Sequence, residues 1–119
     1  MINTGVENNM KIVLVDDEKT IRNVLSTFLS DEGHSVRVAS DGKQGLELLE
    51  EDLPDVVLSD VKMPVMGGME LLKKIQQNYD LPFVIITGYA DMEMAIEALN
   101  NGAFFLLHKP LSFQKRISR

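Results

Sequence analysis

The sequence predicts a single α/β domain in which five parallel strands form a doubly wound sheet with the strand order 2-1-3-4-5. Four short runs are almost entirely apolar, which is typical of strands that a parallel sheet buries on both faces. They occupy residues 12–15, 56–58, 83–86 and 104–107. Stretches with helical spacing of apolar residues lie between them, and strands that alternate with helices are joined by parallel crossovers.

A fifth strand is predicted at residues 34–39, where apolar and polar side chains alternate. Val36 and Val38 are apolar, whereas Ser35 and Arg37 are polar. Alternation indicates a strand with one face in contact with water, so we expect this second strand at an edge of the sheet. With that edge position, the order 2-1-3-4-5 puts the first and third strands on either side of the point where the order reverses.

Four apolar stripes at helical spacing predict the helices that connect the strands. The stripes are Ile21, Val24, Leu25, Phe28 and Leu29; Leu46, Leu49 and Leu53; Met69, Leu72, Ile75 and Tyr79; and Met92, Ala95, Ile96 and Leu99. Asp41 followed by Gln44 resembles a capping box that opens the second helix, and Pro54 ends it. Residues 112–119 leave room for about two turns of a fifth helix.

Length and composition fit one ordinary globular domain. The chain has 119 residues, of which 45% are hydrophobic and 25% are charged. Residues 1–10 are predicted to be a flexible polar tail, and residues 11–119 are predicted to form the domain. The short last helix fits a domain cut from a larger protein.

Charge and patterning exclude several classes of function. The net charge of -6 argues against a sequence-independent hold on nucleic acid. No apolar run approaches the roughly 18 residues of a membrane span, and no basic-then-apolar leader opens the chain. The sequence has no cysteine, which rules out disulfides and thiolate metal sites. We therefore expect a cytoplasmic protein that contacts neither membrane nor nucleic acid through this domain.

Residues suited to phosphate or metal chemistry follow the apolar strands. Asp16 and Asp17 follow the first strand, Asp60 the third, Thr87 the fourth and Lys109 the fifth. Ligands of open parallel sheets bind at the carboxyl ends of the strands, so these side chains are predicted to share one pocket.

The three aspartates predict a site for a hard divalent cation. Clustered carboxylates repel one another, and a cation removes that repulsion. Oxygen ligands without His or Cys favour Mg²⁺ or Mn²⁺ over zinc. In the bland alternative Asp16 and Asp17 only cap the following helix, for which one acid would suffice. Asp60 could be a metal ligand or a nucleophile that takes a phosphoryl group, with Lys109 and Thr87 available to its oxygens.

Four sequence blocks connect the chain to a known family. VLVDDE, LSDVKMPVMGG, VIITGYA and LLHKP resemble, in order and spacing, the motif blocks of the response regulator receiver domain of two-component signalling. The resemblance covers residues 11–111. It implies a flavodoxin-like (βα)5, CheY-like fold and the role of a signalling switch rather than a dedicated enzyme, with magnesium-dependent self-phosphorylation and self-dephosphorylation.

The resemblance also implies roles for individual residues. Asp60 would accept a phosphoryl group from a histidine kinase or histidine phosphotransfer domain, and Thr87 and Lys109 would contact that group. Mg²⁺ would be bound by Asp16, Asp17, Asp60 and the backbone carbonyl of Lys62. A cis peptide would join Lys109 to Pro110. Phosphorylation would switch a surface of the fourth helix, fifth strand and fifth helix that serves an output domain, an effector or a phosphorylation-linked homodimer.

The sequence departs from the family pattern at two positions. Leu106 stands three residues before the strand-end Lys109, where the family usually has an aromatic switch residue. Gly67 stands before Gly68, where an acid is common.

Three other functions compete with a phosphorylated switch. A pseudo-receiver would use the same fold as a constitutive interaction module. A metal-dependent phosphatase would use Asp60 as nucleophile, but Val61 and Lys62 offer no second acid close after it. The hypothesis of nucleotide or flavin binding has even less support, since the sequence contains no glycine-rich phosphate-binding loop.

Overall fold

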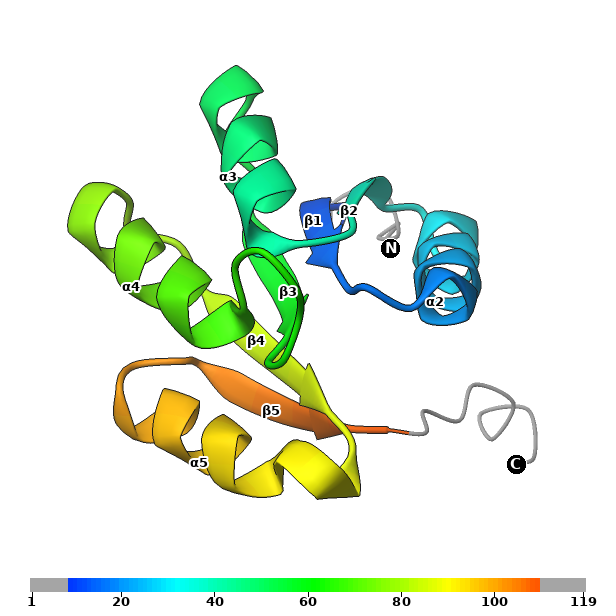
Figure 1. Ribbon diagram of the computed structural model, residues 1–119. Helices are drawn as coiled ribbons and strands as arrows, with labels where there is room; N and C mark the ends of the chain where they lie inside the picture. Colours follow the sequence, from blue (N-terminus) through cyan, green and yellow to red (C-terminus); the bar gives the residue numbers. More distant parts are fainter. Residues whose placement is uncertain (1–8, 110–119) are drawn as a thin grey trace, which may run out of the picture.

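The computed structural model describes residues 9–109 as one five-stranded parallel sheet flanked by helices (Figure 1). The strand order is β2-β1-β3-β4-β5, as predicted. The strands are β1 (Lys11–Val15), β2 (Ser35–Ala39), β3 (Val56–Asp60), β4 (Phe83–Thr87) and β5 (Phe105–His108). The predicted α/β fold class is therefore confirmed, with β2 at an edge.

The helices pack on both faces of this sheet. They are α2 (Lys19–Asp31), α3 (Gly42–Glu51), α4 (Gly68–Asn78) and α5 (Met92–Asn100), with a 3-10 turn η1 (Tyr89–Asp91) before α5. Helix α2 covers one face, whereas α3, α4 and α5 cover the other (Figure 1). Residues 1–8 of the tail predicted at 1–10, the predicted cis bond to Pro110 and the predicted helix at 112–119 lie outside the described residues.

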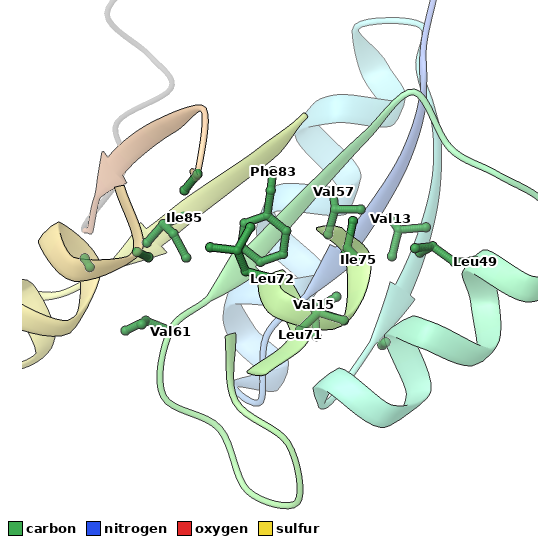
Figure 2. Packing of buried hydrophobic residues seen from close by; sticks show 14 residues of the cluster. Val13, Val15, Leu49, Val57, Val61, Leu71, Leu72, Ile75, Phe83 and Ile85 are labelled. Atoms are coloured by element: carbon green, nitrogen blue, oxygen red, sulfur yellow. The ribbon is translucent and has the colours of Figure 1, made fainter. Parts of the chain in front are cut away.

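Two apolar clusters, one on each face of the sheet, form the core. The larger one joins the inner faces of α3, α4 and α5 to the sheet (Figure 2). Its largest fully buried members are Val13, Val15, Leu49, Val57, Val61, Leu71, Leu72, Ile75, Phe83 and Ile85. The smaller cluster consists of Leu14, Leu25 and Ile86, with Ile21, Val36, Leu58 and Leu107 packed against it. This core fixes the strand ends that carry the polar residues.

The predicted core is wrong at four places, where residues expected to be buried are exposed. Leu53 is exposed because α3 ends at Glu51, two residues earlier. Ile96 is exposed because α5 packs through Ala95 and Ala98, whose small side chains allow close approach to the sheet.

The other two errors concern residues at the margin of the fold. Val24 lies on the outer side of α2. Phe104 is exposed, and Phe105 is 55% exposed on the same face as Leu107. Helix α2 covers this face only over β1 and β2, and β5 lies at the opposite edge of the sheet. The apolar run at 104–107 is therefore an edge strand rather than a strand buried on both faces.

Polar side chains cap both ends of α3. Asp41 accepts a hydrogen bond from the backbone N–H of Gln44 at 2.9 Å, as the capping pattern predicts. Arg37, predicted only as a polar strand residue, donates to the carbonyls of Leu48 (2.9 Å) and Asp52 (2.6 Å). The Leu48 carbonyl also accepts the N–H of the C-cap residue Asp52 at 3.2 Å, whereas the Asp52 carbonyl lies beyond the last turn of the helix. Arg37 therefore ties the C-terminal end of α3 to β2.

The loop between β3 and α4 contains one residue with a strained backbone conformation. Val65 has a φ of 68°, in the left-handed region that a β-branched residue rarely adopts. The loop is held there from both sides, since Gly42 donates to the Met66 carbonyl and Gly68 to the Val61 carbonyl, each at 2.8 Å.

Replacing Val65 with Asn should therefore stabilise the protein by about 1 kcal/mol, because Asn tolerates the left-handed region better than Val. Urea unfolding of Val65→Asn measures the gain. Val38→Asn, at an exposed valine of the extended strand β2, is the control and should give no gain in stability. If Val65→Asn changed the stability by the same amount as Val38→Asn, the left-handed φ of Val65 would not be a source of strain.

Candidate functional site

The carboxyl ends of the strands surround a pocket of about 660 Å³. Residues of four loops line it: Asp17, Glu18, Asp60, Lys62, Met63, Pro64, Gly88, Asp91 and Lys109. The parallel register brings them together, since Val15 pairs with Ser59, Asp60 with Ile86 and Thr87 with His108.

The three predicted aspartates lie together, and two of them, Asp17 and Asp60, line the pocket. Each of Asp16, Asp17 and Asp60 offers one carboxylate oxygen, and these oxygens all lie within 4.8 Å of one another. Asp16 is fully buried and Asp60 nearly so, whereas Asp17 is exposed. The backbone fixes the two buried carboxylates, because Glu18 donates to Asp16 Oδ1 at 2.9 Å and Val61 donates to Asp60 Oδ1 at 2.7 Å.

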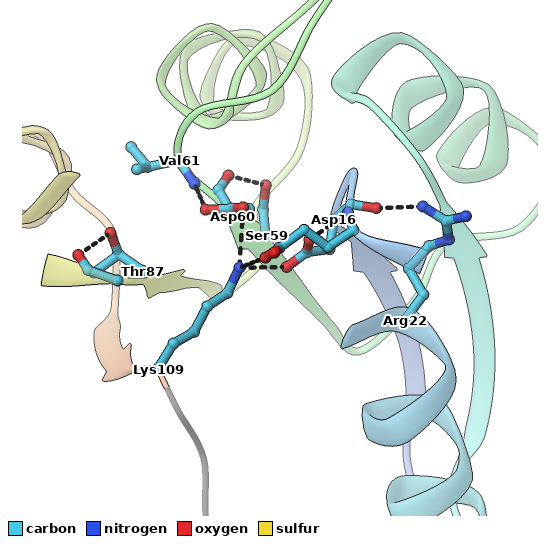
Figure 3. Close-up of polar contacts among 9 residues, drawn as sticks. Asp16, Arg22, Ser59, Asp60, Val61, Thr87 and Lys109 are labelled. Atoms are coloured by element: carbon cyan, nitrogen blue, oxygen red, sulfur yellow. Dashed lines mark hydrogen bonds and ion pairs between the residues drawn. The ribbon is translucent and has the colours of Figure 1, made fainter. Parts of the chain in front are cut away.

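Lys109 lies at the centre of the acidic cluster. Its Nζ is 3.1 Å from Asp16 Oδ2, 3.2 Å from Asp60 Oδ2 and 2.7 Å from Glu18 Oε1 (Figure 3). The strand-end lysine is thus not a solvated surface charge. Its backbone N–H also donates to the Thr87 carbonyl at 2.7 Å, which attaches it to the end of β4.

Burial shifts the proton affinities of these groups. Burial, and then the neighbouring charge of Asp16, raises the pKa of Asp60 from 3.8 to about 6, although Lys109 acts against the rise. Burial also raises the pKa of Asp16. For Lys109, burial acts to lower the pKa, but contacts with Glu18, Asp16 and Asp60 together raise it. The ammonium therefore stays charged and partly neutralises a cluster whose carboxylates repel one another.

Thr87 is at the predicted strand end but does not line the pocket. Its side chain is buried, and Oγ1 donates to the carbonyl of Gly88 at 3.2 Å (Figure 3). Lys62 lines the pocket with an exposed side chain.

Three charged residues of the site escaped the sequence analysis. Glu18 and Asp91 line the pocket. Arg22 donates from Nη1 to the carbonyl of Asp16 at 2.8 Å and so holds the acidic loop from α2 (Figure 3). The only signal for Glu18 was its place directly after the aspartate pair; Arg22 and Asp91 gave none.

The aspartates suit a hard divalent cation. All the oxygens belong to carboxylates, and Mg²⁺ and Mn²⁺ prefer such ligands. Asp16 Oδ2 is buried and within residues 9–109 it accepts no hydrogen bond, although the Lys109 ammonium lies 3.1 Å from it. A cation fits these residues because it would complete the coordination of this oxygen.

The fold and this site together define a CheY-like α/β protein of the receiver class. The chain belongs to the response regulator receiver domain family, whose model matches residues 12–119. A receiver domain is a signalling switch, and the resemblance seen in the sequence is confirmed.

Among curated proteins, the chain is similar to parts of longer regulators. It is 38% identical over 106 residues to the regulatory protein AtoC of Escherichia coli, covering 88% of this chain and 23% of AtoC. It is 36% identical over 111 residues to the probable transcriptional regulator ycf27 of Guillardia theta, covering 93% and 44%. The chain thus spans less than half the length of these relatives.

Solved receiver domains have the same fold. The receiver domain of NtrX from Brucella abortus superposes with a TM-score of 0.80 at 35% identity, covering 89% of this chain and 91% of that one. The BeF3-activated receiver domain of RstA from Klebsiella pneumoniae gives a TM-score of 0.79 at 27% identity, covering 92% and 93%. Within residues 9–109, no helix is long and apolar enough to cross a membrane.

Proposed function

We propose that this receiver domain accepts a phosphoryl group on Asp60 from a histidine kinase or histidine phosphotransfer domain, in a reaction that depends on Mg²⁺. The observation that carries the proposal is the position of Lys109, whose ammonium contacts Asp60 and Asp16 at 3.2 and 3.1 Å inside an open acidic pocket. This position brings together the three parts that the transfer needs. They are a nucleophilic carboxylate (Asp60), a cation for the transferred oxygens (Lys109) and carboxylates that can hold a metal.

In the proposed transfer, Asp60 attacks the phosphorus of a phosphohistidine. A bond forms between a carboxylate oxygen and phosphorus while the bond from phosphorus to the imidazole nitrogen breaks, and the imidazole leaves with its electron pair. At pH 7 a carboxyl with a pKa of about 6 is mostly ionised and can attack. Lys109 would hold one oxygen of the phosphoryl group, and the Thr87 hydroxyl would turn from Gly88 to donate to another.

Asp16, Asp17, Asp60 and the backbone carbonyl of Lys62 would hold the Mg²⁺, or Mn²⁺ in its place. When bound, the metal supplies positive charge that offsets the negative charge on the transferred oxygens. In the metal-free site, the buried Asp16 also holds Lys109 beside Asp60, since Nζ lies 3.1 Å from Asp16 Oδ2 and 3.2 Å from Asp60 Oδ2.

The family also suggests where the output of the proposed switch would lie. The surface of α5, β5 and the last predicted helix would serve an output domain, an effector or a phosphorylation-linked homodimer. AtoC is a regulatory protein of which the chain spans 23%, and this likeness supports a place for the chain in a longer regulator. We expect that regulator to be a cytoplasmic signalling protein. Leu106 on β5 packs against the cluster formed by α3, α4 and α5, so an aromatic rotation at this position would be replaced by movement of an aliphatic side chain.

Acetyl phosphate tests the phosphoacceptor role without a kinase. Intact-mass measurement should show a gain of one phosphoryl group in the presence of Mg²⁺, and EDTA should abolish it. Asp60→Asn should show no gain. Asp80→Asn, at an exposed aspartate outside the pocket, is the matched control and should behave like the wild type.

The competing functions give different results in the same experiment. A pseudo-receiver would gain no mass under conditions that label an active receiver domain. A phosphatase would release phosphate continuously and show no accumulation of the phosphorylated form.

A further inference from the structure

Glu18 makes a contact that a phosphoacceptor pocket does not require. It is the N-cap residue of α2, yet its side chain makes no capping hydrogen bond. Instead, Glu18 Oε1 accepts a hydrogen bond from Lys109 Nζ at 2.7 Å. This contact is shorter than those of the same ammonium to Asp16 (3.1 Å) and Asp60 (3.2 Å). The lysine is therefore shared between the two buried aspartates and a glutamate at the rim.

The backbone holds Glu18 in place independently of its carboxylate. Its N–H donates to Asp16 Oδ1 at 2.9 Å, and its carbonyl accepts from the backbone N–H of Arg22 at 3.0 Å. The side chain itself is 59% exposed. A change of the carboxylate should thus leave the acidic loop and the start of α2 intact.

Lys109 stands where two ligands of the proposed function must bind. Its ammonium touches Asp16 and Asp60, which are also the metal-binding carboxylates. A divalent cation at these oxygens repels an ammonium about 3 Å away, so Lys109 must withdraw when the metal binds. The phosphoryl group then needs the same ammonium at Asp60. Glu18 is the remaining carboxylate that contacts Lys109 within residues 9–109.

We propose that Glu18 is a positioning residue that holds Lys109 at the rim of the pocket. This inference rests on the proposed function and adds that Glu18 affects metal binding and phosphoryl binding in opposite directions. By drawing the ammonium away from Asp16, Glu18 favours binding of the metal. By competing for the ammonium, it opposes binding of the phosphoryl group, which must take Lys109 from it.

The two effects have opposite signs, and this makes the role testable without measuring phosphotransfer. Glu18→Gln should weaken Mg²⁺ binding by about two- to fivefold, the range of an exposed ion pair. At saturating Mg²⁺ the same substitution should tighten binding of BeF3⁻, a phosphoryl mimic, by about two- to fivefold. Isothermal titration calorimetry measures the first affinity and 19F NMR titration the second.

Two further variants separate the contact from the charge. Glu18→Asp keeps the charge but shortens the side chain by one methylene, so it should shift both affinities in the directions seen for Glu18→Gln. Glu50→Gln makes the same charge change on the exposed side of α3 near its C-terminal end and should shift neither.

Several results would overturn the inference. Wild-type affinities in Glu18→Asp would mean that charge alone acts, and a joint fall of both affinities would mean that Glu18 only stabilises the pocket. If the wild type binds Mg²⁺ and BeF3⁻ but Glu18→Gln changes neither, the inference fails and the proposed function stands. If the wild type binds Mg²⁺ but no BeF3⁻, the proposed function fails and the inference falls with it.

Discussion

Asp60→Asn is expected to stabilise the metal-free protein at pH 7.5 by about 2–3 kcal/mol, although it removes the phosphoacceptor. Asp60 is nearly buried beside Asp16, and burial together with that charge raises its pKa from 3.8 to about 6. The difference corresponds to about 3 kcal/mol of destabilisation by the ionised form. Asparagine has a similar shape and no charge, so it removes most of this cost.

The pH dependence of stability in the wild type and in Asp60→Asn tests the direction of this effect a second time. Between about pH 4 and 6 the folded wild type binds a proton at Asp60 that the unfolded chain has lost. The contribution of Asp60 to stability is therefore largest below pH 4, falls as the pH rises to about 6 and is constant above it. Asp60→Asn lacks this contribution.

Urea unfolding in EDTA from pH 4 to 8 measures this difference. The stability difference between Asp60→Asn and the wild type should grow from pH 4 to 6 and then level off. Added Mg²⁺ should stabilise the wild type more than the variant. A variant that is less stable than the wild type at pH 7.5 in EDTA would contradict a strained acidic pocket.

Gly68→Ala is expected to destabilise the protein by about 3 kcal/mol, through the backbone of the phosphoacceptor strand. A Cβ at Gly68 would lie 2.3 Å from the carbonyl oxygen of Asp60 and 2.9 Å from Cα of Val61. Both are backbone atoms, so they cannot move aside as a flexible side chain could, and overpacking of this kind costs about 1–3 kcal/mol or more.

Gly88→Ala is the matched control, since a Cβ there has no other atom within 4 Å. Urea unfolding should show the loss for Gly68→Ala and little change for Gly88→Ala. Equal stabilities of the two variants would show that α4 can retreat from Asp60 at no cost.

Much of the fold could be predicted from periodicity alone. Runs such as 12–15 and 83–86 are buried strands, and the alternation of Val36 and Val38 with polar residues correctly placed β2 at an edge. The site followed from the same pattern, because parallel strands end at one edge of the sheet. Asp16, Asp17, Asp60 and Lys109 converge there for this reason.

The remaining features depend on tertiary contacts that spacing does not encode. Phe105 belongs to an apolar run, but its exposure follows from the distance between β5 and α2 across the sheet. Ile96 fits an apolar stripe, whereas α5 packs through the smaller Ala95 and Ala98. The contact between Glu18 and Lys109 joins residues 91 positions apart, and no local pattern announces it.

The most direct measurement of the central claim identifies the residue that carries the phosphoryl group. The protein is treated with acetyl phosphate and Mg²⁺ and then with borohydride, which reduces an acyl phosphate to an alcohol. Peptide mass spectrometry should find homoserine in place of aspartate at position 60, and only in samples that received Mg²⁺. Homoserine at Asp16 or Asp17 instead, or no reduced residue in a sample that has gained phosphate, would contradict the assignment of Asp60 as the phosphoacceptor.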